Sequence, residues 1–143
     1  MLCPVAIVGT WYHEIMAASP RRRDKRYLVA IPVPYLDRRG HQLSEDKAQR
    51  WVTLAQRELT ECFGGATAVP APGTNIVGGR ILYEAGQVLV VSACDRRDEF
   101  LAQRDRIEVF VGRMGEELDQ DAVFVLAFDS DSFLIELEEG GRS

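Results

Sequence analysis

The residues that could carry out chemistry are few and lie far apart. Neither histidine, His13 or His41, belongs to a His-Glu-x-x-His or Cys-x-x-Cys arrangement, the spacings that hold zinc. The chain also lacks a glycine-rich loop ending in Lys-Ser or Lys-Thr, a Gly-x-Gly-x-x-Gly fingerprint and a Gly-x-Ser-x-Gly nucleophile turn. We therefore expect no cofactor, and the sequence favours a non-catalytic protein without excluding an enzyme.

Aspartates near the C-terminal end form the densest group of possible metal ligands. They are Asp119, Asp121, Asp129 and Asp131. Asp121 and Asp129 flank one predicted strand, which would hold them about 26 Å apart at about 3.3 Å per residue. Side chains at that separation cannot share one ion, so we expect no metal site. Turn formation is the better interpretation of these aspartates.

The composition indicates one ordinary domain. The chain has 143 residues, of which 46% are hydrophobic and 27% charged, enough to bury a core without disulfides. The three cysteines, Cys3, Cys62 and Cys94, are far apart and odd in number, which argues against a disulfide framework. We expect a cytoplasmic protein in which Cys62 and Cys94 are buried. No apolar run approaches the roughly 20 residues that cross a bilayer, so no membrane is expected.

Charge is unevenly distributed along the chain. Residues 1–57 carry ten basic and five acidic side chains, whereas residues 114–143 carry one basic and nine acidic ones. A basic cluster is interpreted as a linker, with phosphate or nucleic-acid binding as the alternative; its members are Arg21, Arg22, Arg23, Lys25 and Arg26. The net charge of −5 and the lack of interleaved aromatic residues argue against nucleic acid as a partner.

Hydrophobic periodicity predicts a strand followed by a long helix. Residues 27–35 carry apolar side chains on both faces. The missing N–H groups of Pro32 and Pro34 would point to the same side, so the second half of this strand should have one unpaired edge or should already have left the sheet. Ser44 suits the N-cap of a helix that ends at Gly64. Apolar residues recur along this helix every three or four positions, so one face is predicted to be buried.

The second half of the chain is predicted to hold further strands and one more helix. After an irregular loop over residues 66–79, residues 80–84 and 87–94 are expected to form a hairpin, with a central strand at Val88–Val91. Further predictions are a helix capped by Asp95 or Asp98, a strand over 122–128, a turn over 129–131 and a last strand over 133–135.

This order predicts a ferredoxin-like α+β sandwich, βαββαβ, with an extra C-terminal edge strand and two helices on one face of an antiparallel sheet. The predicted parts are an N-terminal appendage with the basic linker (residues 1–26), the ferredoxin-like domain (27–137) and an acidic tail (138–143). The other face of the sheet would be apolar and uncovered. We therefore predict a binding or assembly module, which forms a homodimer or binds a protein partner through that face.

A small-molecule-binding regulatory domain is the second hypothesis. Thr67, Asn75, Arg80 and Glu84 lie in or beside the glycine-rich loop, and their polar groups suit a small polar ligand. An ion pair between Arg80 and Glu84 at a sheet edge, worth about 0.2–1 kcal/mol, is the simpler interpretation of those two residues.

Part of the chain resembles a family of small uncharacterised bacterial α+β proteins. The resemblance is carried by the Phe-Gly-Gly-x-Thr turn at residues 63–67, the segment Gly79–Glu84 and the strand Val88–Val91. It covers residues 27–128 and implies a compact α+β domain. It implies no particular activity.

Asp37 suggests the third hypothesis, a metal-dependent nuclease. It ends the first predicted strand and is followed by Arg38-Arg39. That placement is similar to the metal-binding aspartate of CRISPR-associated Cas2-type endonucleases, which implies a catalytic role for Asp37. A turn aspartate is the simpler interpretation.

Overall fold

The computed structural model describes residues 21–137 of the 143-residue chain. Its elements are β1 (Arg21–Val33), α2 (Glu45–Phe63), β2 (Thr67–Pro70), β3 (Gly73–Val77), β4 (Arg80–Glu84), β5 (Val88–Cys94), α3 (Arg97–Glu117) and β6 (Leu126–Glu136). Contacts divide the described residues into a main unit, residues 25–132, and a second unit that contains residues 21–24 and 133–137. Most of the predicted appendage and the predicted tail lie outside the described residues.

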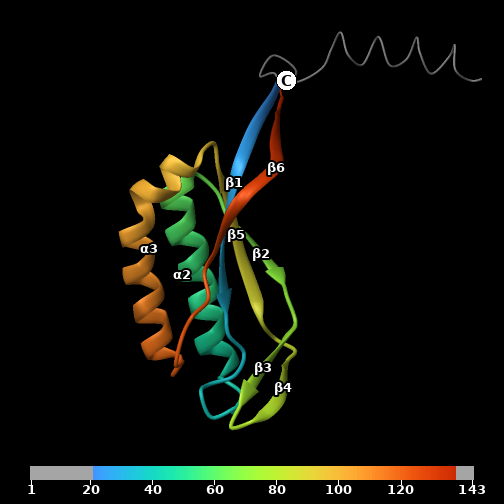
Figure 1. Cartoon of the computed structure of the whole chain (residues 1–143), viewed down its shortest axis with the longest axis vertical. Coiled ribbons are helices and arrows are strands. Elements are labelled where there is room, and N and C mark those ends of the chain that lie inside the picture. Colours follow the sequence, from blue (N-terminus) through green and yellow to red (C-terminus); the bar gives the residue numbers. More distant parts are fainter. Residues whose placement is uncertain (1–20, 138–143) are drawn as a thin grey trace, which may run out of the picture. The chain divides into compact units, whose positions relative to one another are not determined.

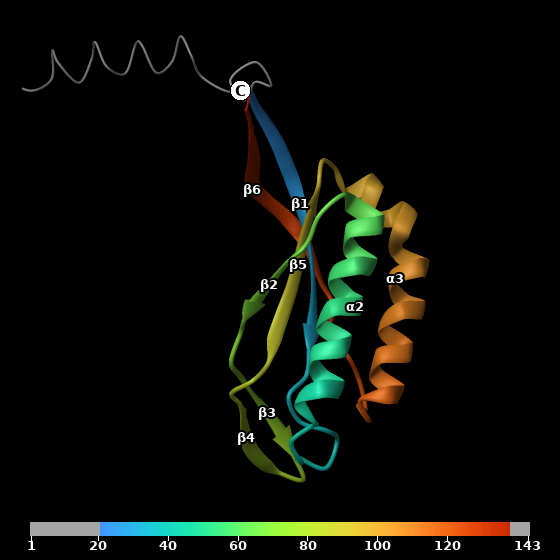
Figure 2. The ribbon, with the colours of Figure 1, turned by 180° about the vertical axis from the view of Figure 1, so that it is seen from behind.

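The strands form a four-stranded sheet in the order β2-β5-β1-β6 and a two-stranded sheet of β3 and β4. Strand β5 is antiparallel to both β1 and β2, with Tyr27 opposite Cys94 and Thr67 opposite Val91. Both helices lie on the same side of the larger sheet (Figures 1 and 2). The predicted α+β fold, with two helices on an antiparallel sheet and β5 as a central strand, is confirmed.

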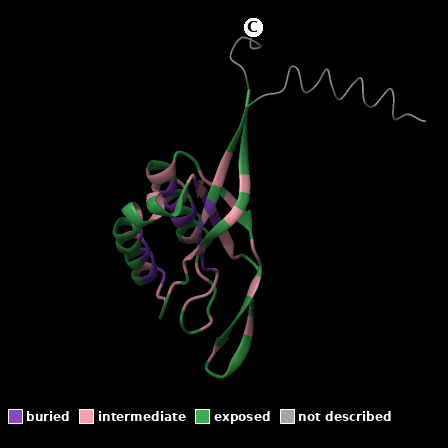
Figure 3. Ribbon diagram, turned by 45° about the horizontal axis from the view of Figure 1, so that its top comes forward, coloured by how far each residue is buried: buried purple, intermediate pink, exposed green. Residues whose placement is uncertain are grey.

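The core lies between the helices and one face of this sheet, where Figure 3 shows the buried segments. Alternate residues of β1 point into it because strand side chains alternate between faces. The buried apolar residues include Tyr27, Val29, Ile31 and Val33 of β1, Trp51, Val52, Ala55 and Leu59 of α2, Val90 and Cys94 of β5, and Ile107, Val111 and Met114 of α3.

The boundaries of α2 follow from its end residues, as predicted. The Ser44 hydroxyl accepts a hydrogen bond from the backbone N–H of Lys47 at 3.2 Å. Gly64 ends the helix with φ 94°, and its N–H donates to the carbonyl of Thr60 at 2.8 Å. Neither α2 nor α3, the two helices among the described residues, has the length and hydropathy needed to cross a membrane.

Strand β1 begins earlier than predicted. It starts at Arg21, so the basic residues 21–26, interpreted as a linker, belong to a strand. It ends at Val33, directly before Pro34. Pro32 is still opposite Leu89 of β5, so the strand stays in the sheet past the first proline and leaves it at the second.

The predicted hairpin between residues 80–84 and 87–94 is wrong. Strand β4 pairs with β3, with Ile76 opposite Ile81, and not with β5. The turn between them is Gly78-Gly79, with φ values of 58° and 77°. Two consecutive residues with positive φ suit a tight hairpin turn, so the glycines that suggested an irregular loop instead join two strands.

The predicted C-terminal turn and the extra edge strand are also wrong. A single strand, β6, runs from Leu126 to Glu136 through Asp129, Ser130 and Asp131. Asp129 and Asp131 are exposed, and β6 lies at the sheet edge. Charged side chains are tolerated in edge strands and discourage pairing with other molecules.

Helix α3 begins without either predicted cap. Its N-cap is Arg96, whose side chain makes no capping hydrogen bond. Asp95 lies one position earlier, and its carboxylate forms an ion pair with Lys25 at 2.9 Å. Asp98 lies within the first turn, where its negative charge favours the positive end of the helix dipole.

Leu59 tests the assignment of the core. Leu59→Ala should lower the free energy of unfolding by about 2–5 kcal/mol, since it leaves a cavity at a fully buried position. The same substitution at Leu101 of α3, which is 39% exposed, should cost less than about 1 kcal/mol. Urea unfolding followed by circular dichroism measures both losses. Equal losses would contradict the placement of the core between the helices and the sheet.

Candidate functional site

The four-stranded sheet has a second apolar face, opposite the helices, which we call the reverse face. Val29, Ala68 and Val90 pack into the core, so their neighbours along each strand point the other way. Its residues are Leu28, Ala30, Pro32, Thr67, Val69, Leu89, Val91, Ala93, Leu126 and Phe128. None of these residues is charged, but the same alternation places the exposed Arg26 at one end of this face. Ala30, at its centre, is only 3% exposed.

The reverse face is most exposed toward its edges. Val69 of β2 is 42% exposed and Phe128 of β6 is 46% exposed, whereas Leu89 and Val91 of β5 are half-buried. Both helices of the described residues lie on the other side of the sheet (Figure 2). An apolar surface in this position marks an interaction site in many proteins.

The β3–β4 hairpin has an apolar face of its own. Ile76 and Ile81 face each other across the strands and are 69% and 76% exposed, and Tyr83 is 62% exposed. On the opposite face, the Leu82 side chain packs against Gly40. A Cβ atom added to Gly40 would lie only 2.5 Å from the Cδ1 atom of Leu82.

The four predicted ligand-binding residues are spread over three strands. Thr67 lies in β2 of the larger sheet, and Asn75 lies in β3. Arg80 and Glu84 are the first and last residues of β4, about 13 Å apart at about 3.3 Å per residue. That separation rules out the predicted ion pair between Arg80 and Glu84 within β4. A ligand site at these four residues stays a prediction.

Glu84 supports the loop that follows β1. Its side chain is buried, with the residue 6% exposed, and its carboxylate accepts a hydrogen bond from the backbone N–H of Leu36 at 3.2 Å. A buried carboxylate needs such a donor because water cannot solvate it. The side-chain amide of Gln120 donates to the carbonyl of Leu36 at 2.8 Å, so this loop is held from two directions.

Asp37 organises a turn. Its carboxylate accepts hydrogen bonds from the backbone N–H groups of Arg39 and His41, at 2.8 and 2.9 Å. These donors, led by that of His41, lower the pKa of Asp37 below its ordinary value. The carboxylate therefore serves the turn, as the simpler interpretation held, and the nuclease hypothesis gains no support.

The basic cluster lies on β1 and is largely paired. Arg22 forms an ion pair with Asp24 at 3.0 Å and stacks over the ring of Phe133 at 5.3 Å. Arg23 pairs with Glu136 at 3.8 Å. With Lys25 bound to a carboxylate as well, much of the positive charge is already offset. Phosphate binding by this cluster stays an untested alternative.

The two described cysteines have structural environments. Cys94 is buried and Cys62 is half-buried. Desolvation raises the pKa of both thiols above the ordinary value. Since the thiolate is the reactive form, neither environment activates a nucleophile.

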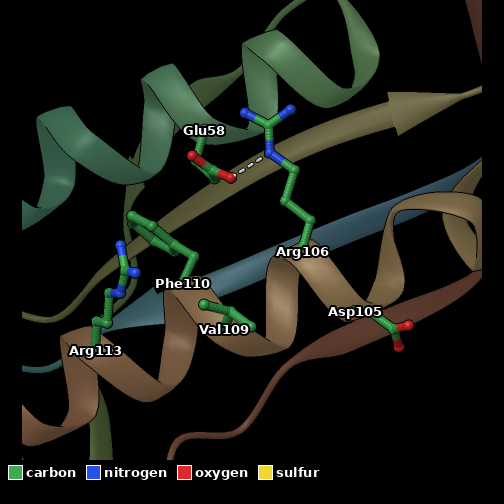
Figure 4. A pocket seen from close by; sticks show the side chains of 6 residues that line it. All are labelled: Glu58, Asp105, Arg106, Val109, Phe110 and Arg113. Atoms are coloured by element: carbon green, nitrogen blue, oxygen red, sulfur yellow. Dashed lines mark hydrogen bonds and ion pairs between the residues drawn. The ribbon is translucent and has the colours of Figure 1, made fainter.

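Two of the cavities formed by the described residues lie on the helical side, and none of the four predicted ligand residues lines either of them. One, of about 180 Å³, lies where the end of β1 meets the start of α2 and β5, and is lined by Tyr35 and Val52 among others. The other, of about 380 Å³, is a groove on α3 beside α2 (Figure 4). Sequence reasoning found neither, because each joins residues from separate elements.

Comparisons with known proteins bear on the fold. No protein-family model matches the chain, and no curated protein matches it. A phage SAM lyase in complex with S-methyl-5'-thioadenosine superposes with a TM-score of 0.52 and 12% identity, over 78% of this chain and 90% of that chain. The phage SAM lyase in its apo state gives a TM-score of 0.50 and 15% identity, over 80% and 91%.

A divalent cation tolerance protein, CutA1 from Thermus thermophilus, is a further structural match. Its TM-score is 0.45 and its identity 14%, over 75% of this chain and 85% of that chain. At identities this low, the phage enzyme shares a fold with this chain, and the comparison extends no further. The phage enzyme lends no support to a Cas2-type nuclease, and the hypothesis based on Asp37 stays unsupported.

The pH dependence of stability tests the role of Asp37. A carboxyl group whose pKa is lower in the folded state stabilises the fold above its unfolded pKa, and this contribution is lost as pH falls through the folded pKa. Asp37→Asn should therefore destabilise the protein near about pH 6, and its difference from wild type should shrink below about pH 4. Urea unfolding across this range measures the effect.

The matched control is Asp131→Asn, at an exposed position of β6. This variant should change stability little at either pH. If Asp37→Asn differed from wild type by the same amount near about pH 6 and about pH 2, the ionised carboxylate would not be what holds the turn.

Proposed function

We propose that this chain is a non-catalytic assembly module whose reverse face binds the reverse face of a second copy. The observation that carries the proposal is the apolar surface opposite the helices. Val69 and Phe128, 42% and 46% exposed, would be withdrawn from water in such a dimer. Burial contributes roughly 25 cal/mol for each Å² of apolar surface.

The chemistry of the reverse face favours its own copy as the partner. Apart from Arg26 at one end of this face, it presents no charged side chain that a charged peptide, a nucleic acid or a metal ion could recognise. Two sheets pack face to face about 10 Å apart when both facing sides are apolar. A two-fold dimer brings the same surface together from both subunits, so an apolar face meets an apolar face.

The topology of the larger sheet supports the proposal. Its elements follow the order β1, α2, β2, β5, α3 and β6, with the β3–β4 hairpin inserted between β2 and β5. This is the order of a ferredoxin-like sandwich, in which both helices cover one side. Such a sandwich leaves one sheet face for a partner.

The size of the reverse face predicts a modest affinity. Four strands about 4.8 Å apart and roughly six residues long give about 400 Å² of flat area for each subunit. Two such faces give about 800 Å² in total, which is below the roughly 1,200–2,000 Å² that stable specific interfaces bury. We therefore expect a dimer that dissociates on dilution.

The remaining predictions stay hypotheses beside this proposal. They include the small-molecule-binding regulatory domain, another protein as the partner, a cytoplasmic location, and membership of the bacterial family with the Phe-Gly-Gly-x-Thr turn. The separation of Thr67, Asn75, Arg80 and Glu84 weighs against the regulatory domain relative to the assembly module.

Charged substitutions on the reverse face test the proposal. Val69→Glu combined with Phe128→Glu should convert a concentration-dependent dimer into a monomer, because four carboxylates would meet in the interface. Sedimentation velocity of the full chain between about 1 and about 500 µM, a range suited to a modest dimer, measures the change. Circular dichroism shows whether the variant is folded.

Leu101→Glu is the matched control, since it introduces the same charge on α3 at a position that is 39% exposed. It should leave the dimer intact. A wild-type chain that stays monomeric up to about 500 µM would overturn the proposal. A dimer that survives in the folded double variant would place the interface elsewhere and would overturn it equally.

A further inference from the structure

The groove on α3 beside α2 combines an aromatic floor with a free positive charge. It has a volume of about 380 Å³, and its lining residues are Glu58 of α2 and Asp105, Arg106, Val109, Phe110 and Arg113 of α3. Arg106, Val109, Phe110 and Arg113 share one helix face, because residues three, four and seven positions apart align. The volume falls within the range of small-molecule sites, about 300–1,000 Å³.

At one end of the groove, the charge of Arg106 is paired with two carboxylates. The guanidinium of Arg106 donates to the carboxylates of Glu58 at 2.6 Å and Glu61 at 2.5 Å. These two contacts tie α3 to α2 and occupy both carboxylates. Figure 4 shows the contact with Glu58. Asp105 points away from α2 in the same view. A cationic ligand would therefore have to compete with Arg106 for Glu58.

The other end carries the available charge. Arg113 is exposed and forms no ion pair or hydrogen bond with any residue in the described range 21–137. Glu117, one turn further along α3, is engaged by Arg50 at 3.1 Å. The five N–H donors of a free guanidinium match the two oxygens of a carboxylate.

The floor between these ends is apolar and rigid. Phe110 is half-buried, and its ring meets that of Trp51 edge to face, with centroids 5.5 Å apart and planes at 61°. Val109 beside it is 58% exposed. Trp51 is 5% exposed and packs in the core, so it fixes the orientation of the Phe110 ring.

We propose that this groove binds a small aromatic carboxylate. The carboxylate accepts hydrogen bonds from the Arg113 guanidinium, and the ring of the ligand packs on Phe110 and Val109. The negative charge of the ligand is attracted by the positive charge of Arg113, so the groove should bind an aromatic carboxylate more tightly than a neutral aromatic compound. The Arg106–Glu58 ion pair bounds the other end of the groove. The site lies on the helical side, so a dimer formed through the reverse face leaves it accessible, and either proposal can fail alone.

Trp51 provides a direct readout of binding. The chain has two tryptophans, Trp11 and Trp51. In a Trp11→Phe background, the fluorescence of Trp51 reports on the Phe110 ring it touches. Benzoate should change this fluorescence saturably at about millimolar concentration, as expected for a ligand of few atoms. Benzamide, which is neutral and similar in shape, should bind at least about tenfold more weakly.

Two arginine variants on the same helix give a matched comparison. Arg113→Gln should weaken benzoate binding by about tenfold or more, since it removes a charge-assisted hydrogen bond. Arg113→Lys, which keeps the charge, should restore part of the affinity. Arg104→Gln removes an equal charge outside the groove, where Arg104 pairs with Glu108 at 3.1 Å, and should leave the affinity unchanged within about twofold.

Phe110→Leu tests the floor and should weaken benzoate binding while the folded spectrum is kept. Three results would overturn the proposal. They are equal binding of benzamide and benzoate, equal losses in Arg113→Gln and Arg104→Gln, and no saturable change up to about 50 mM benzoate, a limit set by the expected affinity of small ligands.

Discussion

The rest of the structure depends on the burial of one side of β1 and β5 beneath the two helices. Both strands are apolar on both faces, so either face could in principle have received the helices. Residues such as Ile31 and Val90, at 0% exposed, occupy the side that α2 and α3 cover. Once that side is covered, the remaining face keeps its apolar character without a layer of helices above it. The proposed dimer interface and the groove on α3 therefore lie on opposite sides of one sheet.

The parts of the fold that depend on local sequence could be predicted, and those that depend on distant partners could not. The α2 boundaries follow from Ser44 and Gly64, because capping is decided within a few residues. Strand pairing depends on residues that are far apart in the sequence. The sequence therefore could not show whether β4 pairs with β3, which precedes it, or with β5, which follows it. Asp129 and Asp131 misled for the same reason, since only the position of β6 at the sheet edge makes them acceptable in a strand.

The candidate sites also differ in how far they depend on contacts between distant residues. The reverse face follows from alternation along single strands, which the sequence displays directly. The groove instead requires knowing that α3 brings Phe110 against Trp51 of α2, while leaving Arg113 without a carboxylate among residues 21–137. Asp37 and Glu84 show that a polar residue singled out as a possible ligand-binding or catalytic residue can instead have a structural role. Each of them is committed to backbone N–H groups of the loop after β1.

Ion pairs between early and late parts of the chain bear on the order in which the fold is stabilised. Arg23, Arg38 and Arg50 pair with Glu136, Asp119 and Glu117 respectively. Residues 21–57 carry ten basic and four acidic side chains, so this segment repels itself while its late partners are out of place. Docking of the late segments therefore relieves a repulsion that the early segments cannot relieve alone.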